Sequence, residues 1–168
     1  WLVDGIAKVG VLRFDPDATG PGELVEFSTA VVAAEVTGRG PVSLALFGYA
    51  DRPDELVELD WRTGGVTPLR ASAELDLDPA GVSAATGVTW DGPDGAVHAW
   101  YYPPSSASCQ APAGELPPVQ VWIHGGPTSY SAPEFSVAVQ FWTSRGIGIL
   151  DVNYSGSTGY GRAYRNRL

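Results

Sequence analysis

The sequence is poor in the residues that carry several common chemistries. Its 168 residues include no methionine, one cysteine and two histidines. The single cysteine, Cys109, cannot form an internal disulfide, which fits a reduced, cytoplasmic setting. No CxxC, HExxH or carboxylate cluster occurs, so we expect neither a metal site nor a cofactor.

Long hydrophobic runs and targeting segments are absent too. No stretch of about 18 apolar residues occurs, so the sequence predicts no transmembrane helix. No charged segment followed by an apolar one marks a signal peptide. Because the chain starts at Trp1 and lacks methionine, we expect it to be an excerpt whose true N-terminus lies elsewhere.

Positive charge is scarce and unevenly placed in this chain of net charge −9. Residues 1–118 carry 17 acidic and 6 basic side chains, whereas residues 119–168 carry 2 acidic and 4 basic ones. Binding nucleic acid requires clustered Lys and Arg, so the acidic part argues against a nucleic-acid partner. The excess of acids is typical of a surface that keeps a protein in solution.

The first seventy residues have the pattern of short strands separated by turns. Gly, Pro and Asp clusters, such as Thr37–Pro41 and Asp51–Asp54, punctuate them in the manner of hairpins. Apolar and charged residues partly alternate over Leu56–Trp61, the period of a half-buried strand. The predicted strands are 6–14, 24–27, 31–36, 42–49, 55–61 and 66–69.

A weak internal repeat relates Val9–Asp15 to Leu56–Arg62, with Leu12 and Phe14 matching Leu59 and Trp61. Four short antiparallel strands in about 40–50 residues is the spacing of a β-propeller blade. Residues 28–70 would form one blade and residues 1–27 the outer strands of the blade before it. A β-sandwich remains an alternative on this pattern alone.

The residue composition and the predicted elements change after residue 70. Residues 71–85 are interpreted as a linker, and 87–90 with 96–102 as a hairpin. The Pro-rich stretch 103–118 is expected to be an irregular loop. Residues 119–153 then have the pattern of an apolar strand, a helix over 135–144 and a second apolar strand. This strand–helix–strand order predicts a parallel α/β unit, with the strand 119–123 buried on both faces.

A glycine-rich turn, His124–Pro127, directly follows the first of these apolar strands. Glycines allow close approach of the backbone to a substrate. An amide N–H held there can stabilise a developing oxyanion, a contribution of roughly 3 kcal/mol per donor. A tight turn without chemistry is the alternative on this motif alone.

This turn and the segment Asp151–Arg162, with its Asn-Tyr-Ser-Gly-Ser-Thr-Gly-Tyr-Gly run, together resemble the prolyl oligopeptidase family of serine peptidases, over about residues 86–168. Within this family, the sequence resembles acylaminoacyl-peptidase and dipeptidyl-peptidase-like members. The resemblance implies a mixed fold: the C-terminal strands of a β-propeller (1–70, a blade and a half), a linker (71–85), and the N-terminal portion of an α/β-hydrolase domain (86–168), left incomplete.

The resemblance also implies roles for individual residues. The turn His124, Gly125 and Gly126 would supply part of an oxyanion hole, through the backbone of Gly125 and Gly126 ahead of the His124 side chain. Ser155 stands where the family commonly has Arg. The following loop is interpreted as structural, bracing the sheet edge near the site: Asn153, Tyr154, Gly156, Ser157, Gly159, Tyr160 and Gly161.

The nucleophile itself is missing. No Gly-x-Ser-x-Gly occurs, and the family's catalytic triad follows the matched region, so we expect it beyond Leu168. His98 is expected to be structural. His124 as a base for Ser129 or Ser131 is not favoured, because no carboxylate orients it.

The sequence therefore predicts part of a serine peptidase that hydrolyses short peptides by acyl transfer. The chain alone is expected to be inactive. The alternatives are a truncated, non-catalytic binding or regulatory module, and an esterase of the same fold. The expected partners are a peptide substrate and the rest of the polypeptide, which would cover the open sheet edge.

Overall fold

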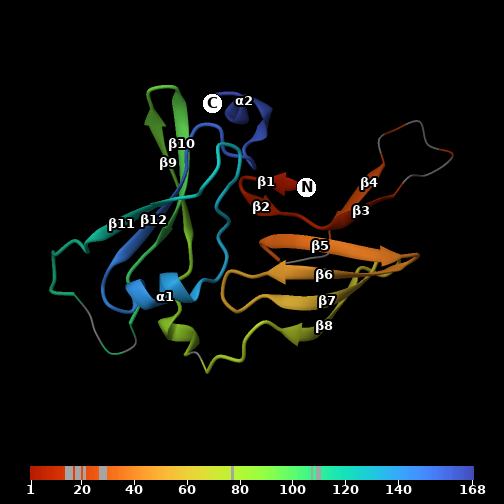
Figure 1. The fold of residues 1–168 in the computed structure, drawn as a ribbon, viewed down its shortest axis with the longest axis horizontal. Helices are drawn as coiled ribbons and strands as arrows, with labels where there is room; N and C mark the ends of the chain where they lie inside the picture. Colours follow the sequence, from red (N-terminus) through yellow and green to blue (C-terminus); the bar gives the residue numbers. More distant parts are fainter. Residues whose placement is uncertain are drawn as a thin grey trace.

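The computed structural model describes residues 1–13, 17, 20, 22–26, 30–76, 78–106, 108 and 111–168. Two four-stranded sheets lie side by side, with a small N-terminal hairpin near the C-terminal end of the chain (Figure 1). The strands are β1 (Leu2–Val3), β2 (Ile6–Ala7), β3 (Gly10–Arg13), β4 (Glu23–Glu26), β5 (Val32–Arg39), β6 (Val42–Gly48), β7 (Glu55–Asp60), β8 (Gly65–Ala71), β9 (Thr86–Gly92), β10 (Gly95–Tyr102), β11 (Val119–Ile123) and β12 (Gly148–Asn153). The helices are the 3-10 turn η1 (Pro79–Gly81), α1 (Val137–Thr143) and α2 (Gly161–Arg165).

The first large sheet is an antiparallel meander in the order β5-β6-β7-β8. The four strands predicted between residues 31 and 69 are confirmed, with ends that shift by up to three residues. Gly40 and Gly64, both with φ of +75°, occupy two of its hairpin turns. Glycine adopts this left-handed conformation without strain, which explains why these positions punctuate the strands.

The core of this sheet follows from alternation along its central strands. In β6, Ala45 and Phe47 are buried whereas Leu44 and Leu46 are exposed. Successive side chains of a strand point to opposite faces, so one face packs and the other remains open. Buried side chains of β7 complete a cluster with Val9, Ala30 and Tyr49.

The single strand predicted over residues 6–14 is wrong. Asp4 and Gly5, with φ of 49° and 75°, turn the chain back so that β1 pairs with β2. A separate strand, β3, then pairs with β4. The predicted strand ends at Phe14 and Phe27, like Cys109, lie outside the described residues.

The second large sheet has the order β11-β12-β10-β9 and contains both strand directions. β11 and β12 are parallel, as the strand–helix–strand pattern predicts, and β12 is antiparallel to β10 of the predicted hairpin. The connecting helix α1 is shorter than the predicted 135–144. Ser136 accepts a hydrogen bond from the amide of Val139 as its N-cap, so Phe135 precedes the helix.

The prediction that 119–123 is buried on both faces is wrong. Val119, Val121 and Ile123 are 46%, 64% and 69% exposed. β11 is an end strand of its sheet, and no described element covers this row of side chains. The apolar pattern therefore predicts the strand correctly but not its burial.

The two sheets meet through the segment before α1. The amide of Phe135 donates to the carbonyl of Tyr49 at the end of the first sheet (2.7 Å). Ile6 of β2 packs against the second core, formed by Trp100, Tyr102, Val139 and Ile149. No helix in the described part of the chain is long and apolar enough to cross a membrane.

Candidate functional site

The glycine-rich turn begins directly after β11 and is open to solvent. Gly126 has a φ of +72°, a left-handed conformation that favours glycine. A Cβ added to Gly125 or Gly126 would meet nothing within 4 Å. A substrate group could therefore approach the backbone of the turn closely.

The loop between β12 and α2 holds the carbonyl side of this turn. The Tyr154 hydroxyl donates to the carbonyl oxygen of Gly126 (2.5 Å) and shares this proton with the more distant carbonyl oxygen of His124 (3.3 Å). The amide of Thr158 donates to the carbonyl of Ser129 (3.0 Å). The carbonyl groups of His124, Gly126 and Ser129 are thus held by hydrogen bonds from this loop.

The same contacts determine where the amides of the turn point. In a planar trans peptide, C=O and N–H point in opposite directions. Because the His124 carbonyl faces Tyr154, the N–H of Gly125 faces away from it. Among the described residues, no acceptor is found for the amide of Gly125 or of Gly126. The turn therefore presents the Gly125 N–H on the side away from Tyr154, and both glycines are exposed with no amide acceptor among the described residues.

The His124 side chain links the turn to the loop between β12 and α2. Its Nε2 lies 2.7 Å from the Ser157 hydroxyl oxygen, which itself donates to the Tyr154 carbonyl (2.7 Å). The hydroxyl proton is committed to that carbonyl, so we assign Nε2–H of His124 as the donor to Ser157. The imidazole also stacks on the Tyr154 ring, with centroids 4.4 Å apart. Ser157 is fully buried, so this pair is a brace and not a nucleophile with its base.

Asn153 anchors the far end of the turn segment. Its side-chain oxygen accepts from the Ser131 amide (2.8 Å), and its side-chain nitrogen donates to the Ser131 carbonyl (3.0 Å) and the Tyr160 hydroxyl (3.2 Å). The Asn153 carbonyl accepts from the Tyr164 hydroxyl. Asn153 is 0% exposed, so these bonds form in a region screened from water, where leaving them unmade is costly.

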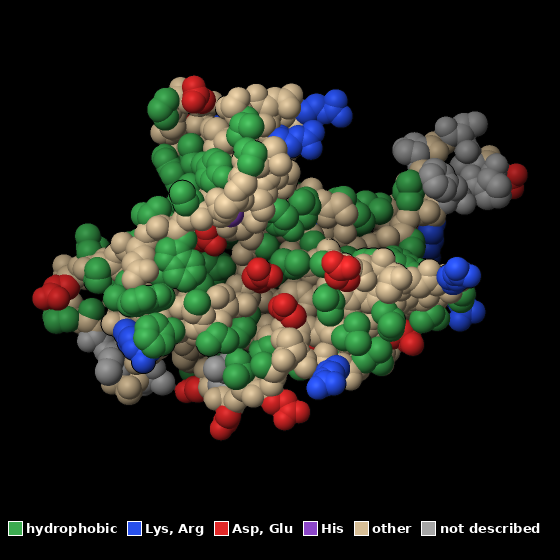
Figure 2. Space-filling view, viewed as in Figure 1, with side chains coloured by type: hydrophobic (Ala, Val, Ile, Leu, Met, Phe, Trp, Pro, Cys, Tyr) green, Lys and Arg blue, Asp and Glu red, His purple; other side chains and the backbone are tan. Residues whose placement is uncertain are grey.

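A cavity of about 350 Å³ lies beside Ser131, between the two sheets. Its lining includes Tyr102, Glu134 and Asp151. Burial, followed by the neighbouring Asp54 and Asp151 carboxylates, raises the pKa of Glu134. Burial likewise raises the pKa of Asp151, although the Ser131 hydroxyl that donates to it (2.7 Å) acts in the opposite direction. Figure 2 shows acidic side chains near the middle of this face of the molecule.

These raised pKa values predict a pH-dependent stability. A carboxyl group with a raised pKa binds its proton more tightly in the folded than in the unfolded chain. Its contribution is fully present below the unfolded pKa and is lost as the pH rises through the folded one. Glu134→Gln is therefore expected to raise the melting temperature of the complete polypeptide at about pH 8, with the gain vanishing near pH 4. Glu58→Gln, on the exposed face of β7, is the control; an equal gain there would contradict the prediction.

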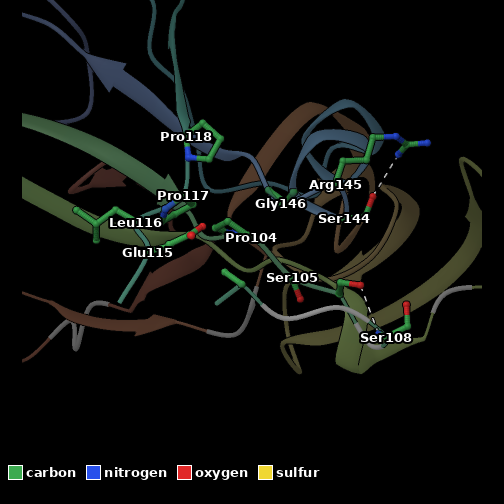
Figure 3. Close-up of a pocket in the computed structure, with 13 residues that line it drawn as sticks. Pro104, Ser105, Ser108, Glu115, Leu116, Pro117, Pro118, Ser144, Arg145 and Gly146 are labelled. Atoms are coloured by element: carbon green, nitrogen blue, oxygen red, sulfur yellow. Dashed lines mark hydrogen bonds between the residues drawn. The ribbon is translucent and has the colours of Figure 1, made fainter. Parts of the chain in front are cut away.

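A larger cavity, of about 950 Å³, lies between the Pro-rich loop and the C-terminal end of α1 (Figure 3). Arg145 stands at its edge, where it donates to the Ser144 hydroxyl (3.3 Å) and stacks on Phe141. The described residues that line it include no histidine. Glu115 is the one carboxylate among these described lining residues, and no histidine accompanies it there. The turn after β11 is therefore the better candidate for a hydrolytic site.

The sequence and the structure of the chain are similar to those of known hydrolases. No protein-family model matches the sequence. A crystal structure of puromycin hydrolase is 42% identical, with a TM-score of 0.86, over 98% of this chain and 25% of that one. A puromycin-hydrolyzing peptidase of Mycobacterium tuberculosis is 40% identical, with a TM-score of 0.85 and the same coverage. The dipeptidyl-peptidase 4 of Giardia intestinalis is 33% identical over 78 residues, which are 45% of this chain and 10% of that protein.

The chain belongs to the prolyl oligopeptidase family. An acylaminoacyl peptidase that is 23% identical shares the fold, with a TM-score of 0.63. The chain spans about a quarter of the length of these solved hydrolases. Its mostly β-sheet structure matches the corresponding part of chains of this family.

Within this family member, the structure brings the two predicted groups of residues together. The turn His124–Gly126 and the loop 153–160 are separated in sequence by some thirty residues yet are hydrogen-bonded along their length. Gly161 lies apart from the turn, at the start of α2. His98 stacks on Tyr160 and lies 3.0 Å from the Thr89 hydroxyl, in keeping with a structural role.

Sequence reasoning missed two further groups near the turn. Ser131 pairs with Asp151, and Glu134 lies in the cavity between the sheets. Asp151 could have been suspected, because it is a carboxylate in the middle of an otherwise apolar strand. Glu134 gives no such signal, since the segment around it has no regular period.

Proposed function

We propose that the complete protein is a serine peptidase that hydrolyses short peptides and aminoacyl amides, and that this chain supplies the oxyanion side of its active site. The observation that supports this proposal is the exposed turn whose His124 and Gly126 carbonyls are held by Tyr154, while the amides of Gly125 and Gly126 have no acceptor among the described residues. Donors held in advance toward a developing negative charge are a main source of stabilisation in acyl transfer.

In this proposal the nucleophile, base and acid come from a part of the protein outside this chain. The serine oxygen attacks the substrate carbonyl, its proton passes through the base to the leaving amine, and water then releases the acyl group. The Gly125 amide, with Gly126 beside it, donates to the oxyanion. The His124 imidazole orients the turn, because its Nε2–H is committed to Ser157.

The antiparallel sheet β5–β8 is proposed to be a blade of a β-propeller, preceded by strands of another blade, within residues 1–70. Residues 71–85 would be the linker, and residues 86–168 the first portion of an α/β-hydrolase domain. The exposed side chains of Val119, Val121 and Ile123 on β11 support this division. An exposed apolar edge favours association, and the rest of the polypeptide would cover it.

The substrate proposal rests on the two solved hydrolases that are at least 40% identical to this chain. Both are named for hydrolysis of puromycin, so puromycin is the first substrate to test. Peptide substrates follow from the family to which the chain belongs.

The test compares the complete protein with the 168-residue chain in two assays, puromycin hydrolysis and labelling by a fluorophosphonate. The complete protein is expected to hydrolyse puromycin and to label at one serine outside residues 1–168. The chain by itself is expected to do neither. Labelling of the isolated chain, or a complete protein inert toward both reagents, would refute the proposal.

A further inference from the structure

The N-terminal hairpin contacts the loop that holds the oxyanion-side turn. The amide of Gly5, at the tip of the β1–β2 hairpin, donates to the carbonyl of Gly159 (3.3 Å). A Cβ added to Gly159 would lie 3.0 Å from the Gly5 Cα, so the two backbones touch. In Figure 1 the hairpin lies next to α2 and the loop before it, far in sequence from both.

Gly5 also sets the position of Tyr160. A Cβ added to Gly5 would lie 2.8 Å from the Tyr160 hydroxyl oxygen and 3.6 Å from the Trp100 ring. The Tyr160 ring stacks on His98 with an interplanar angle of 1° and centroids 4.3 Å apart. The ring is thus confined by His98 on one face and by Gly5 at its hydroxyl end.

Tyr160 is connected to the turn segment through Asn153. Its hydroxyl accepts from the side-chain nitrogen of Asn153, which binds both backbone groups of Ser131. Ser131 ends the segment that starts at His124. A continuous series of contacts therefore runs from Gly5 through Tyr160 and Asn153 to Ser131.

We infer that the Asp4–Gly5 tip of the β1–β2 hairpin is a positioning element for the oxyanion-side turn, acting through Tyr160 and Asn153. The expected effect of this element on kcat rests on the proposed function. Its expected effect on the order of the turn does not. A short hairpin outside the second sheet thus helps to align the amides of Gly125 and Gly126. Gly5 itself touches no substrate in this role.

The test substitutes Gly5 in the complete protein, with a control of matched backbone conformation. Gly5→Ala adds a methyl group against Tyr160, whereas Gly40→Ala adds one at the same φ of +75° with nothing within 4 Å. Gly5→Ala is expected to lower kcat for puromycin about 10-fold with KM changed less than about twofold, since small misplacements far from the chemistry reduce rate more than binding. Gly40→Ala should stay within about twofold of the parent in both constants.

A double-mutant cycle tests the route through the tyrosine. Tyr160→Phe retains the ring and removes both the atom nearest to the added methyl group and the acceptor for Asn153. Gly5→Ala is expected to lower kcat less than about threefold further in the Tyr160→Phe protein, because coupled residues are not additive. Full activity of Tyr160→Phe, or additive losses, would overturn the inference.

Hydrogen exchange separates this inference from the proposed function. The Ser131 amide donates to Asn153 (2.8 Å), so its exchange should accelerate in Gly5→Ala and Tyr160→Phe but not in Gly40→Ala. This holds even for a protein that hydrolyses nothing. Equal exchange in Gly5→Ala and Gly40→Ala would refute the positioning role, whereas an inert parent with the expected exchange would refute the function alone. If Gly5→Ala does not fold, unchanged Ser131 exchange in Tyr160→Phe would refute the role.

Discussion

Asn153→Ala is expected to lower the free energy of unfolding of the complete protein by about 3 kcal/mol, because it removes the three hydrogen bonds of a fully buried side chain and leaves their partners unsatisfied. The lost partners are the amide and carbonyl of Ser131 and the hydroxyl of Tyr160. The substitution also leaves a void at a fully buried position. Fluorophosphonate labelling should slow as well, since the turn that ends at Ser131 would no longer be held. Urea unfolding and labelling rates measure the two effects.

Two further variants make this result specific. Asn166→Ala removes the same side chain from an exposed position after α2 and is expected to change stability by less than about 0.5 kcal/mol. Asn153→Asp keeps an acceptor for the Ser131 amide but loses both donated bonds and buries a carboxylate against the Ser131 carbonyl, so at neutral pH it should destabilise at least as much as Asn153→Ala. If Asn153→Ala and Asn166→Ala were equally stable, Asn153 would not be the anchor described here.

The local part of the fold could be predicted from the sequence because its signals are local. The hairpins between residues 31 and 71 are marked by glycine, proline and aspartate at the turns, and by alternation within the strands. The parallel pair β11 and β12 follows from two apolar strands around a helix. In both cases neighbouring residues determine the element and its direction.

The contacts that organise the site could not be predicted in this way. The bond between His124 and Ser157 joins residues 33 positions apart, and that between Gly5 and Gly159 joins opposite ends of the chain. Such pairs depend on how the elements pack, which no period in the sequence encodes. The same reason explains the wrong prediction of a single strand over residues 6–14. Its apolar pattern favours one strand, but the chain breaks at Lys8 and Val9, because β2 pairs with β1 whereas β3 pairs with β4.

Tyr154→Phe is expected to lower kcat of the complete protein by roughly 10- to 100-fold, approaching the loss seen when one oxyanion donor is removed. The hydroxyl is the group that fixes the carbonyls of His124 and Gly126. Without it the peptide between His124 and Gly125 is free to rotate, and its N–H no longer points steadily toward the exposed side. The phenylalanine ring can still stack on His124, so the fold should persist and the loss should fall on the rate.

The matched control is Tyr101→Phe in β10. The Tyr101 hydroxyl has no hydrogen-bond partner among the described residues, so its removal should leave kcat within about twofold of the parent. The pair is compared by puromycin turnover and by the rate of fluorophosphonate labelling, with the melting temperature as a check on folding. Because the hydroxyl of Tyr154 acts on the transition state through the backbone, KM should change little while kcat falls. A Tyr154→Phe protein as active as Tyr101→Phe would show that the turn is held without this hydroxyl, and the amides of Gly125 and Gly126 would need another source of alignment.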